Sequence, residues 1–277
     1  MKKLIAVWGS SGSGKTSFAA NLAQSLYRFY KEEKRVAVVF ASQVVPVLSY
    51  MFPEMKKSEM RSLGAALSKP VITKTDILKN MIPVSGMTNF GVMGFIDGEN
   101  VYSYPEFETD KIKQFLNELR QIVDYVIVDC DPDIKSAFSD ALFEMSDILF
   151  SVVNPDLKSI SWNSSVMSYF DRLNVFKVNF ITVVNHKTPG PALPSENFKR
   201  TRGDVVLEVP YDEFANKKYS EGKVFTKIRC KEYARSLGEA VEMINFNEGP
   251  VYSGVFRRKN EIAYDFNYDM SQDSEAL

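Results

Sequence analysis

A glycine-rich stretch near the start of the chain has the residue types and spacing of a phosphate-binding loop. Positions 9–16 read GSSGSGKT and satisfy the pattern G-x-x-x-x-G-K-[ST], between an apolar run and a helical pattern. Glycines let successive backbone N–H groups turn toward phosphate oxygens, and the N-terminus of the following helix adds partial positive charge. In such loops the lysine reaches the β- and γ-phosphates, and the hydroxyl of the next residue ligates Mg²⁺. The residues expected to bind a nucleoside triphosphate are Gly9, Ser11, Gly12, Ser13, Gly14, Lys15, Thr16 and Ser17.

An acidic stretch, DYVIVDCDPD at positions 124–133, can supply the carboxylate that such a loop requires. A short apolar run leads to Asp129, as expected for a strand that ends beside the loop. A carboxylate in this place holds Mg²⁺, usually through water, so Thr16 and Asp129 are the predicted metal-site residues. Taken alone, the stretch also fits a buried strand that ends in a solvated acidic turn. Lys15, Asp129 and Asp131 are the predicted catalytic residues.

Apolar runs and helical patterns alternate along the chain and would position these residues. The runs cover positions 4–8, 36–41, 125–129, 148–153, 180–184 and 205–209, and apolar residues recur at helical spacing over 18–29, 112–123 and 230–244. Continuous apolar runs are typical of strands that are buried on both faces. We therefore predict an α/β fold, with a doubly wound, mostly parallel sheet flanked by helices.

The domain organisation follows from where these patterns stop. The P-loop domain is expected to span 1–246, and a polar, extended or disordered tail is expected over 247–277. Positions 42–98 are interrupted by prolines at 46, 53, 70 and 83. Their methionine-rich stretches are compatible with short helices, and the sequence assigns this segment no definite structure.

The composition excludes several classes of protein. The 277 residues are 45% hydrophobic and 25% charged, with a formal net charge of -1, which gives no overall attraction to nucleic acid or anionic lipid. No apolar run approaches the roughly 20 residues that a membrane-spanning helix needs. Cys130 and Cys230 stand far apart, which argues against a disulfide framework or a zinc site. We expect a cytoplasmic protein without an integral membrane segment.

Several stretches beyond the loop resemble the MinD/ParA group of P-loop ATPases of the SIMIBI class, and they occur in the family's order. They are Asp129 to Pro132, VVNPDLKSI at 152–160, ITVVN ending at Asn185, and VPYDEFANKKYSEGK at 209–223. The resemblance implies ATP and Mg²⁺ as cofactors, and contacts near the base by Asn185 and by the stretch that includes Pro210. It also implies a homodimer. In character the chain is most similar to the TadZ/CpaE-like pilus-positioning proteins.

Two parts of the family's hydrolytic machinery are missing from the sequence. The family carries a second lysine one residue after the first loop glycine, where it contacts the partner's nucleotide, and this chain has Ser10. The family also places aspartates at the end of the second strand, where this chain has Phe40 and Ser42. Positioning and charge stabilisation set the rate of phosphoryl transfer, so we expect weak ATP hydrolysis, with Asp131 as a substitute acid.

The resemblance implies that the protein acts by binding partners under nucleotide control. The expected role is a positioning or assembly factor for pilus or secretion machinery, or for mobile-element partition, which a protein partner can recruit to a pole or a membrane-associated complex. The alternative is a P-loop kinase that transfers phosphate to a protein or small-molecule acceptor, and tail tyrosines 252, 264 and 268 are the features that suggest it. Between Glu196 and Arg235, ten basic residues face seven acidic ones, so a solvated surface is favoured over a DNA-binding patch.

Overall fold

The fold is described by a computed structural model for residues 2–173, 179–186, 192–198 and 205–246. The predicted tail at 247–277, with its tyrosines, lies outside these residues, as do Lys199, Arg200 and Arg202 of the basic segment. In the described part of the chain, no helix is both long enough and apolar enough to cross a membrane.

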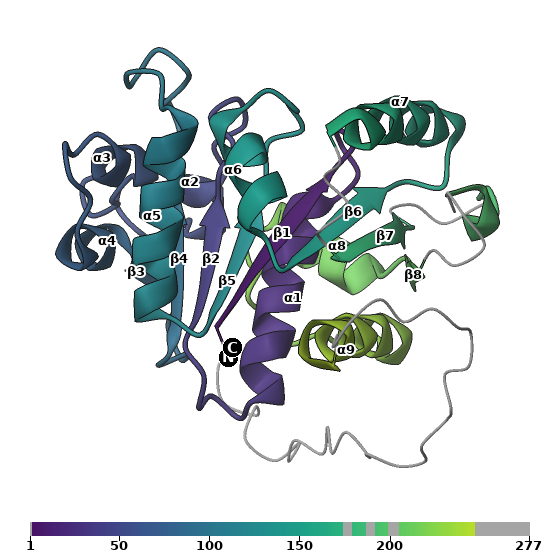
Figure 1. Cartoon of the computed structure of the whole chain (residues 1–277). Coiled ribbons are helices and arrows are strands. Elements are labelled where there is room, and N and C mark those ends of the chain that lie inside the picture. Colours follow the sequence, from purple (N-terminus) through teal and green to yellow (C-terminus); the bar gives the residue numbers. More distant parts are fainter. Residues whose placement is uncertain (1, 174–178, 187–191, 199–204, 247–277) are drawn as a thin grey trace, which may run out of the picture.

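Eight strands of the described chain form one sheet in the order β3-β4-β2-β5-β1-β6-β7-β8 (Figure 1). Their bounds are β1 Lys3–Gly9, β2 Val36–Phe40, β3 Ile82–Pro83, β4 Phe90–Gly94, β5 Tyr125–Asp129, β6 Ile148–Val153, β7 Asn179–Asn185 and β8 Val206–Val209. Neighbouring strands pair in parallel, except that β3 and β4 are antiparallel. The predicted fold class is therefore confirmed.

Helices cover both faces of this sheet (Figure 1). They are α1 Lys15–Phe29, α2 Leu48–Met51, α3 Leu63–Leu67, α4 Lys74–Asn80, α5 Thr109–Ile122, α6 Ala137–Met145, α7 Leu157–Leu173, α8 Glu213–Ser220 and α9 Lys231–Phe246, with a short 3₁₀ helix at Ser195–Phe198. The helical patterns predicted over 18–29, 112–123 and 230–244 fall within or overlap α1, α5 and α9.

Side chains of the central strand β1 alternate between two hydrophobic cores. Ile5 and Val7 pack on one face with apolar residues of α1 and α9. Leu4, Ala6 and Trp8 pack on the other face with residues of α5, α6 and α7. Because both faces are covered, every position of such a strand must be apolar, which explains the continuous runs in the sequence.

The segment at positions 42–98 holds the elements that the sequence left unassigned. It contains the short helices α2 to α4 and also the strands β3 and β4. Strand β4 was missed because its sequence, FGVMG, contains two glycines, which are unfavourable in strand interiors. Packing explains both of them: a Cβ at Gly91 would lie 2.2 Å from the Met81 sulfur, and one at Gly94 would lie 3.1 Å from the Phe40 Cβ.

Candidate nucleotide-binding site

The glycine-rich loop joins the end of β1 to the start of α1 in a conformation that requires glycine. Gly12 and Gly14 have φ angles of 73° and 85°, in the left-handed region, and Gly14 is the N-cap of α1. A Cβ at Gly9, whose φ is 150°, would lie 2.0 Å from the carbonyl oxygen of Val152 in β6. The loop is thus held close to β6 while it turns into the helix, which is the arrangement that directs backbone N–H groups toward an anion.

Lys15 is buried at the start of α1, and its ammonium group lies inside the loop. The Nζ atom donates to the carbonyl oxygen of Ser10 at 3.1 Å, and the side chain is only 7% exposed. A buried ammonium group needs negatively charged or strongly polar partners. Phosphate oxygens in the loop would meet that requirement better than a neutral carbonyl oxygen.

Thr16 and Asp129 meet where α1 begins and β5 ends. Strands β1 and β5 place Val7 opposite Asp129, and the Thr16 hydroxyl donates to Asp129 Oδ2 at 2.6 Å. Asp129 Oδ1 is buried and has no hydrogen-bond partner among the described residues. Burial raises the pKa of Asp129 to about 6, although the Thr16 hydrogen bond and the charge of Lys15 oppose the shift.

These groups fit Mg²⁺ that arrives together with a nucleotide. An uncompensated buried carboxylate oxygen beside a threonine hydroxyl offers the oxygen ligands that this cation prefers. Among the described residues, no cluster of three or more His, Cys, Asp or Glu could hold a metal ion by itself. Phosphate oxygens and water would therefore have to complete the coordination shell around Thr16 and Asp129.

Asp131 lies two residues beyond β5 and is held by the segment that follows β2. Its Oδ2 accepts from the Ser42 hydroxyl at 2.8 Å, and its Oδ1 accepts from the backbone N–H of Asp133 at 3.0 Å. The carboxyl group is buried. Phe40, which stands where the resemblance expects an acid, points into the hydrophobic core and supplies no polar group.

Ser10, at the position of the family's second lysine, contacts α7. Its Oγ lies 3.4 Å from Ser159 Oγ, and either hydroxyl can donate. Only 7% of Ser10 is exposed. A side chain in this place is turned into the protein and is too short to reach another molecule.

The remaining predicted residues lie around the loop. Asn185, at the end of β7, donates from Nδ2 to the Ser13 carbonyl oxygen at 2.8 Å, so it touches the loop directly. Pro210 follows β8, whose last residue Val209 is paired with Asn185. The three serines differ: Ser11 is exposed, Ser13 is buried with an unpartnered Oγ among the described residues, and Ser17 is half-buried on α1.

Sequence reasoning missed one side chain at this site, Tyr219 of α8. It lies close enough to Asp129 for the charge of that carboxylate to act on its hydroxyl. Burial, and then the charge of Asp129, raise the pKa of the Tyr219 hydroxyl, which stays protonated. Its position lies within the stretch 209–223, but a lone tyrosine on a polar helix carries no signal that would direct it to this site.

Solved structures share this architecture over most of their length. A ParA-family ATPase from Chlorobium tepidum superimposes with a TM-score of 0.70 at 16% identity, over 87% of this chain and 97% of that one. The septum site-determining protein MinD from Pyrococcus horikoshii, complexed with Mg-ADP, gives 0.67 at 16% identity, over 88% and 96%. The chain has the fold of the MinD/ParA family of ATPases.

Sequence comparison gives one relative of this chain. An uncharacterised ATP-binding protein from Methanocaldococcus jannaschii is 26% identical over 168 residues, which cover 60% of this chain and 57% of that protein. No family model matches the chain. The predicted resemblance is thus confirmed for the MinD/ParA fold, while the finer likeness to TadZ/CpaE-like proteins stays a prediction.

Proposed function

We propose that this chain is an ATP-binding protein of the MinD/ParA type that uses Mg²⁺. The observation that carries the proposal is the convergence of Lys15, Thr16 and Asp129 at the adjoining ends of β1 and β5. The ATP-binding relative and the Mg-ADP complex of a protein with the same fold support it.

The chain's own residues have distinct tasks in this proposal. The glycine loop and Lys15 bind the phosphates, and Asn185 braces the loop from β7. The resemblance to the family also implies a contact between the Asn185 amide and the base. Thr16 and Asp129 hold Mg²⁺, which neutralises charge on the phosphates when it is bound. Neither task requires Ser10, Phe40 or Ser42, so binding of ATP does not depend on the positions at which the chain departs from the family.

Hydrolysis is proposed to be slow for a structural reason. Ser10 is directed at Ser159 and Phe40 lies in the core, so neither adds charge or a proton acceptor at the phosphates. Loss of one well-placed electrostatic group typically lowers a rate by about two to three orders of magnitude. We assign the residual activity to Asp131, whose buried carboxylate is held by the Ser42 hydroxyl and the Asp133 N–H.

Because turnover is slow, we propose that the presence of bound ATP controls whether the protein binds its partner. A protein with this fold from Aquifex aeolicus is described as a MinC:MinD complex, which provides a precedent for a protein partner. We propose a homodimer that positions or assembles a cellular structure, such as pilus or secretion machinery or a partitioning mobile element. A size-exclusion measurement with and without ATP tests the dimer.

Binding of a fluorescent ATP analogue tests the site itself. Lys15→Ala should weaken binding by roughly tenfold to a hundredfold, because a charge-assisted contact with phosphate is lost. Lys74→Ala, which changes an exposed lysine of α4, serves as the matched control and should bind as wild type does. Equal affinity of the Lys15→Ala variant and wild type would show that the phosphates lie elsewhere. Transfer of labelled phosphate to an acceptor, instead of its release, would favour a kinase.

A further inference from the structure

Helix α8 lies on α1 without a fully buried side chain. Each of its eight residues is half-buried or exposed, and Tyr219 packs only at the edge of the core that α1 and α9 share. Helix α9 differs, because Leu237, Val241 and Ile244 are buried in that core. Most of the stability of a helix in a protein comes from packing of its apolar face. Helix α8 is therefore held much less firmly than α9.

Both ends of α8 are attached to the rest of the fold. At the start, the Asp212 side chain caps the helix and accepts from the Phe214 N–H at 2.9 Å. Beyond the end, Gly222 has a φ of 72°, and a Cβ there would lie 2.2 Å from the Tyr50 carbonyl oxygen. Val224 then anchors the returning segment in the core. The helix is thus suspended between two fixed points.

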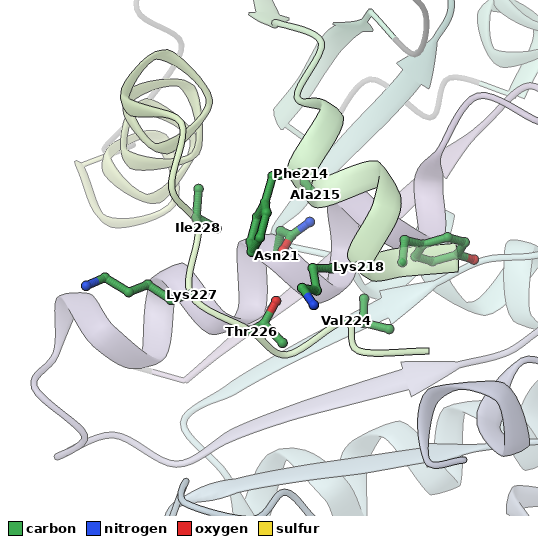
Figure 2. Close-up of a pocket in the computed structure, with 9 residues that line it drawn as sticks. Asn21, Phe214, Ala215, Lys218, Val224, Thr226, Lys227 and Ile228 are labelled. Atoms are coloured by element: carbon green, nitrogen blue, oxygen red, sulfur yellow. The ribbon is translucent and has the colours of Figure 1, made fainter. Parts of the chain in front are cut away.

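The contact between α8 and α1 is incompletely filled. A small cavity lies between Asn21 of α1, Phe214 and Lys218 of α8, and the returning segment at 224–228 (Figure 2). Its volume of about 10 Å³ is close to the space that a single water molecule needs. Atoms that line such a space lose part of their dispersion contacts. The packing of α8 on α1 is therefore weaker than packing inside the core.

Phe214, near the start of α8, is held by a cation from outside the helix. The Cζ atom of the exposed Arg229 guanidinium lies 4.4 Å from the centroid of the Phe214 ring, which is within the range of a cation–aromatic attraction. Arg229 belongs to the returning segment that leads into α9, so this contact joins α8 to the part of the chain that follows it. Lys218 Nζ lies 5.5 Å from the same centroid, but it belongs to α8 and cannot fasten that helix to another element.

We propose that α8 is a flap that opens as a unit, with the contact between Phe214 and Arg229 as its latch. Opening separates α8 from α1 and uncovers Asn21, which is only 6% exposed when the flap is closed. Helix α9 keeps its place, because its core packing does not depend on α8. Since α1 begins at the phosphate loop, the flap gives the fold a second arrangement beside the nucleotide site. The inference goes beyond the proposed function and needs no nucleotide.

Hydrogen exchange of the backbone amides in the full chain, without nucleotide, tests the flap. In wild type, protection factors in α8 should be at least roughly tenfold lower than those in the buried turns of α9, because α8 opens while the core stays folded. Arg229→Gln should lower protection in α8 by a further factor of about two to five, the strength of an exposed cation–aromatic contact, and leave α9 unchanged. Arg229→Lys keeps the charge but loses the flat guanidinium, so its effect should be intermediate.

A double-mutant cycle and a matched control make the test specific to the latch. Phe214→Leu keeps an apolar side chain and removes the ring, and its combination with Arg229→Gln should lower protection no further than the larger single effect. Lys231→Gln is the control, because it removes an exposed positive charge close to Arg229 in the sequence. It should leave the protection of α8 at the wild-type value.

Several results would overturn the inference. Equal protection of α8 and α9 in wild type would mean that α8 does not open separately. Wild-type protection of α8 in Arg229→Gln, or additive effects in the double variant, would mean that the two side chains do not form a latch. Equal losses in α8 and α9 would mean that the contact supports the whole fold. Absence of ATP binding by wild type would instead contradict the proposed function and leave the flap intact.

Discussion

The Ser42 hydroxyl donates a 2.8 Å hydrogen bond to the Asp131 carboxylate and so links the segment after β2 to the turn after β5. Ser42 stands where the resemblance to the MinD/ParA group expects an acid. Here the carboxylate comes from the neighbouring strand, and the serine holds it in place. The segment after β2 therefore contributes a hydroxyl group, and the turn after β5 contributes the acid.

This relationship leads to a prediction for hydrolysis. Wild-type protein without a partner should release phosphate more slowly than about 1 s⁻¹, the lower end of ordinary enzyme rates. Asp131→Asn should reduce that residual rate at least roughly tenfold, because the amide cannot accept a proton from water. Ser42→Ala, which keeps the acid and removes its donor, should give an intermediate rate in the same phosphate-release assay.

Asp133→Asn is the control for this series, because Asp133 is exposed and lies in the same turn. It should retain the wild-type rate. Turnover well above about 1 s⁻¹ in wild type, or an Asp131→Asn variant as active as wild type, would assign the chemistry to another group.

The burial of Asp129 predicts how stability depends on pH when no metal or nucleotide is bound. Its pKa in the folded protein is about 6, above the ordinary value of 3.8, mainly because of burial. The folded state then binds the proton more tightly than the unfolded state, so the contribution of Asp129 to stability falls as pH rises from 3.8 to about 6. Above that window the buried negative charge is a constant penalty.

Urea unfolding of wild type and Asp129→Asn at about pH 4.5 and about pH 7.5 measures this effect. The free energy of unfolding should fall more in wild type than in the variant between the two values. Saturating Mg-ATP at the higher pH should then stabilise wild type more than Asp129→Asn, because the ligand binds the folded state. Parallel pH profiles for the two proteins would mean that Asp129 is not the buried acid described here.

Gly222 predicts a large local effect on stability. Gly222→Ala should lower the free energy of unfolding by several kcal/mol, since the new Cβ would lie 2.2 Å from the backbone oxygen of Tyr50 in α2. Gly86 has a similar φ of 76°, but no atom lies within 4 Å of the place that a methyl group would occupy, so Gly86→Ala should cost only about 1 kcal/mol. Denaturant unfolding compares the two variants. Equal losses in the free energy of unfolding would show that the positive φ, and not the clash with the Tyr50 oxygen, accounts for the effect at Gly222.

The sequence alone determined the phosphate loop, because a loop motif is local. The loop requires Gly12 and Gly14, which have positive φ, followed by a lysine and a threonine. Because these residues are neighbours along the chain, the motif can be recognised without knowledge of the fold. The same holds for the apolar strands. A strand covered on both faces must be apolar at each position, which makes β1, β2 and β5 readable as continuous runs.

Only the tertiary structure decided which distant side chains meet at this loop. The hydrogen bond between Ser42 and Asp131 depends on β2 lying beside β5, and that between Asn185 and the Ser13 carbonyl oxygen depends on β7 ending near the loop. Strand β4 was not predicted because its two glycines are unfavourable in a strand when read alone. Only the side chains of other segments that pack against them explain why they are there. The place of Tyr219 beside Asn21 was not predicted for the same physical reason: it arises from the packing of α8 on α1, and packing between distant elements leaves no periodic pattern in the residues that make it.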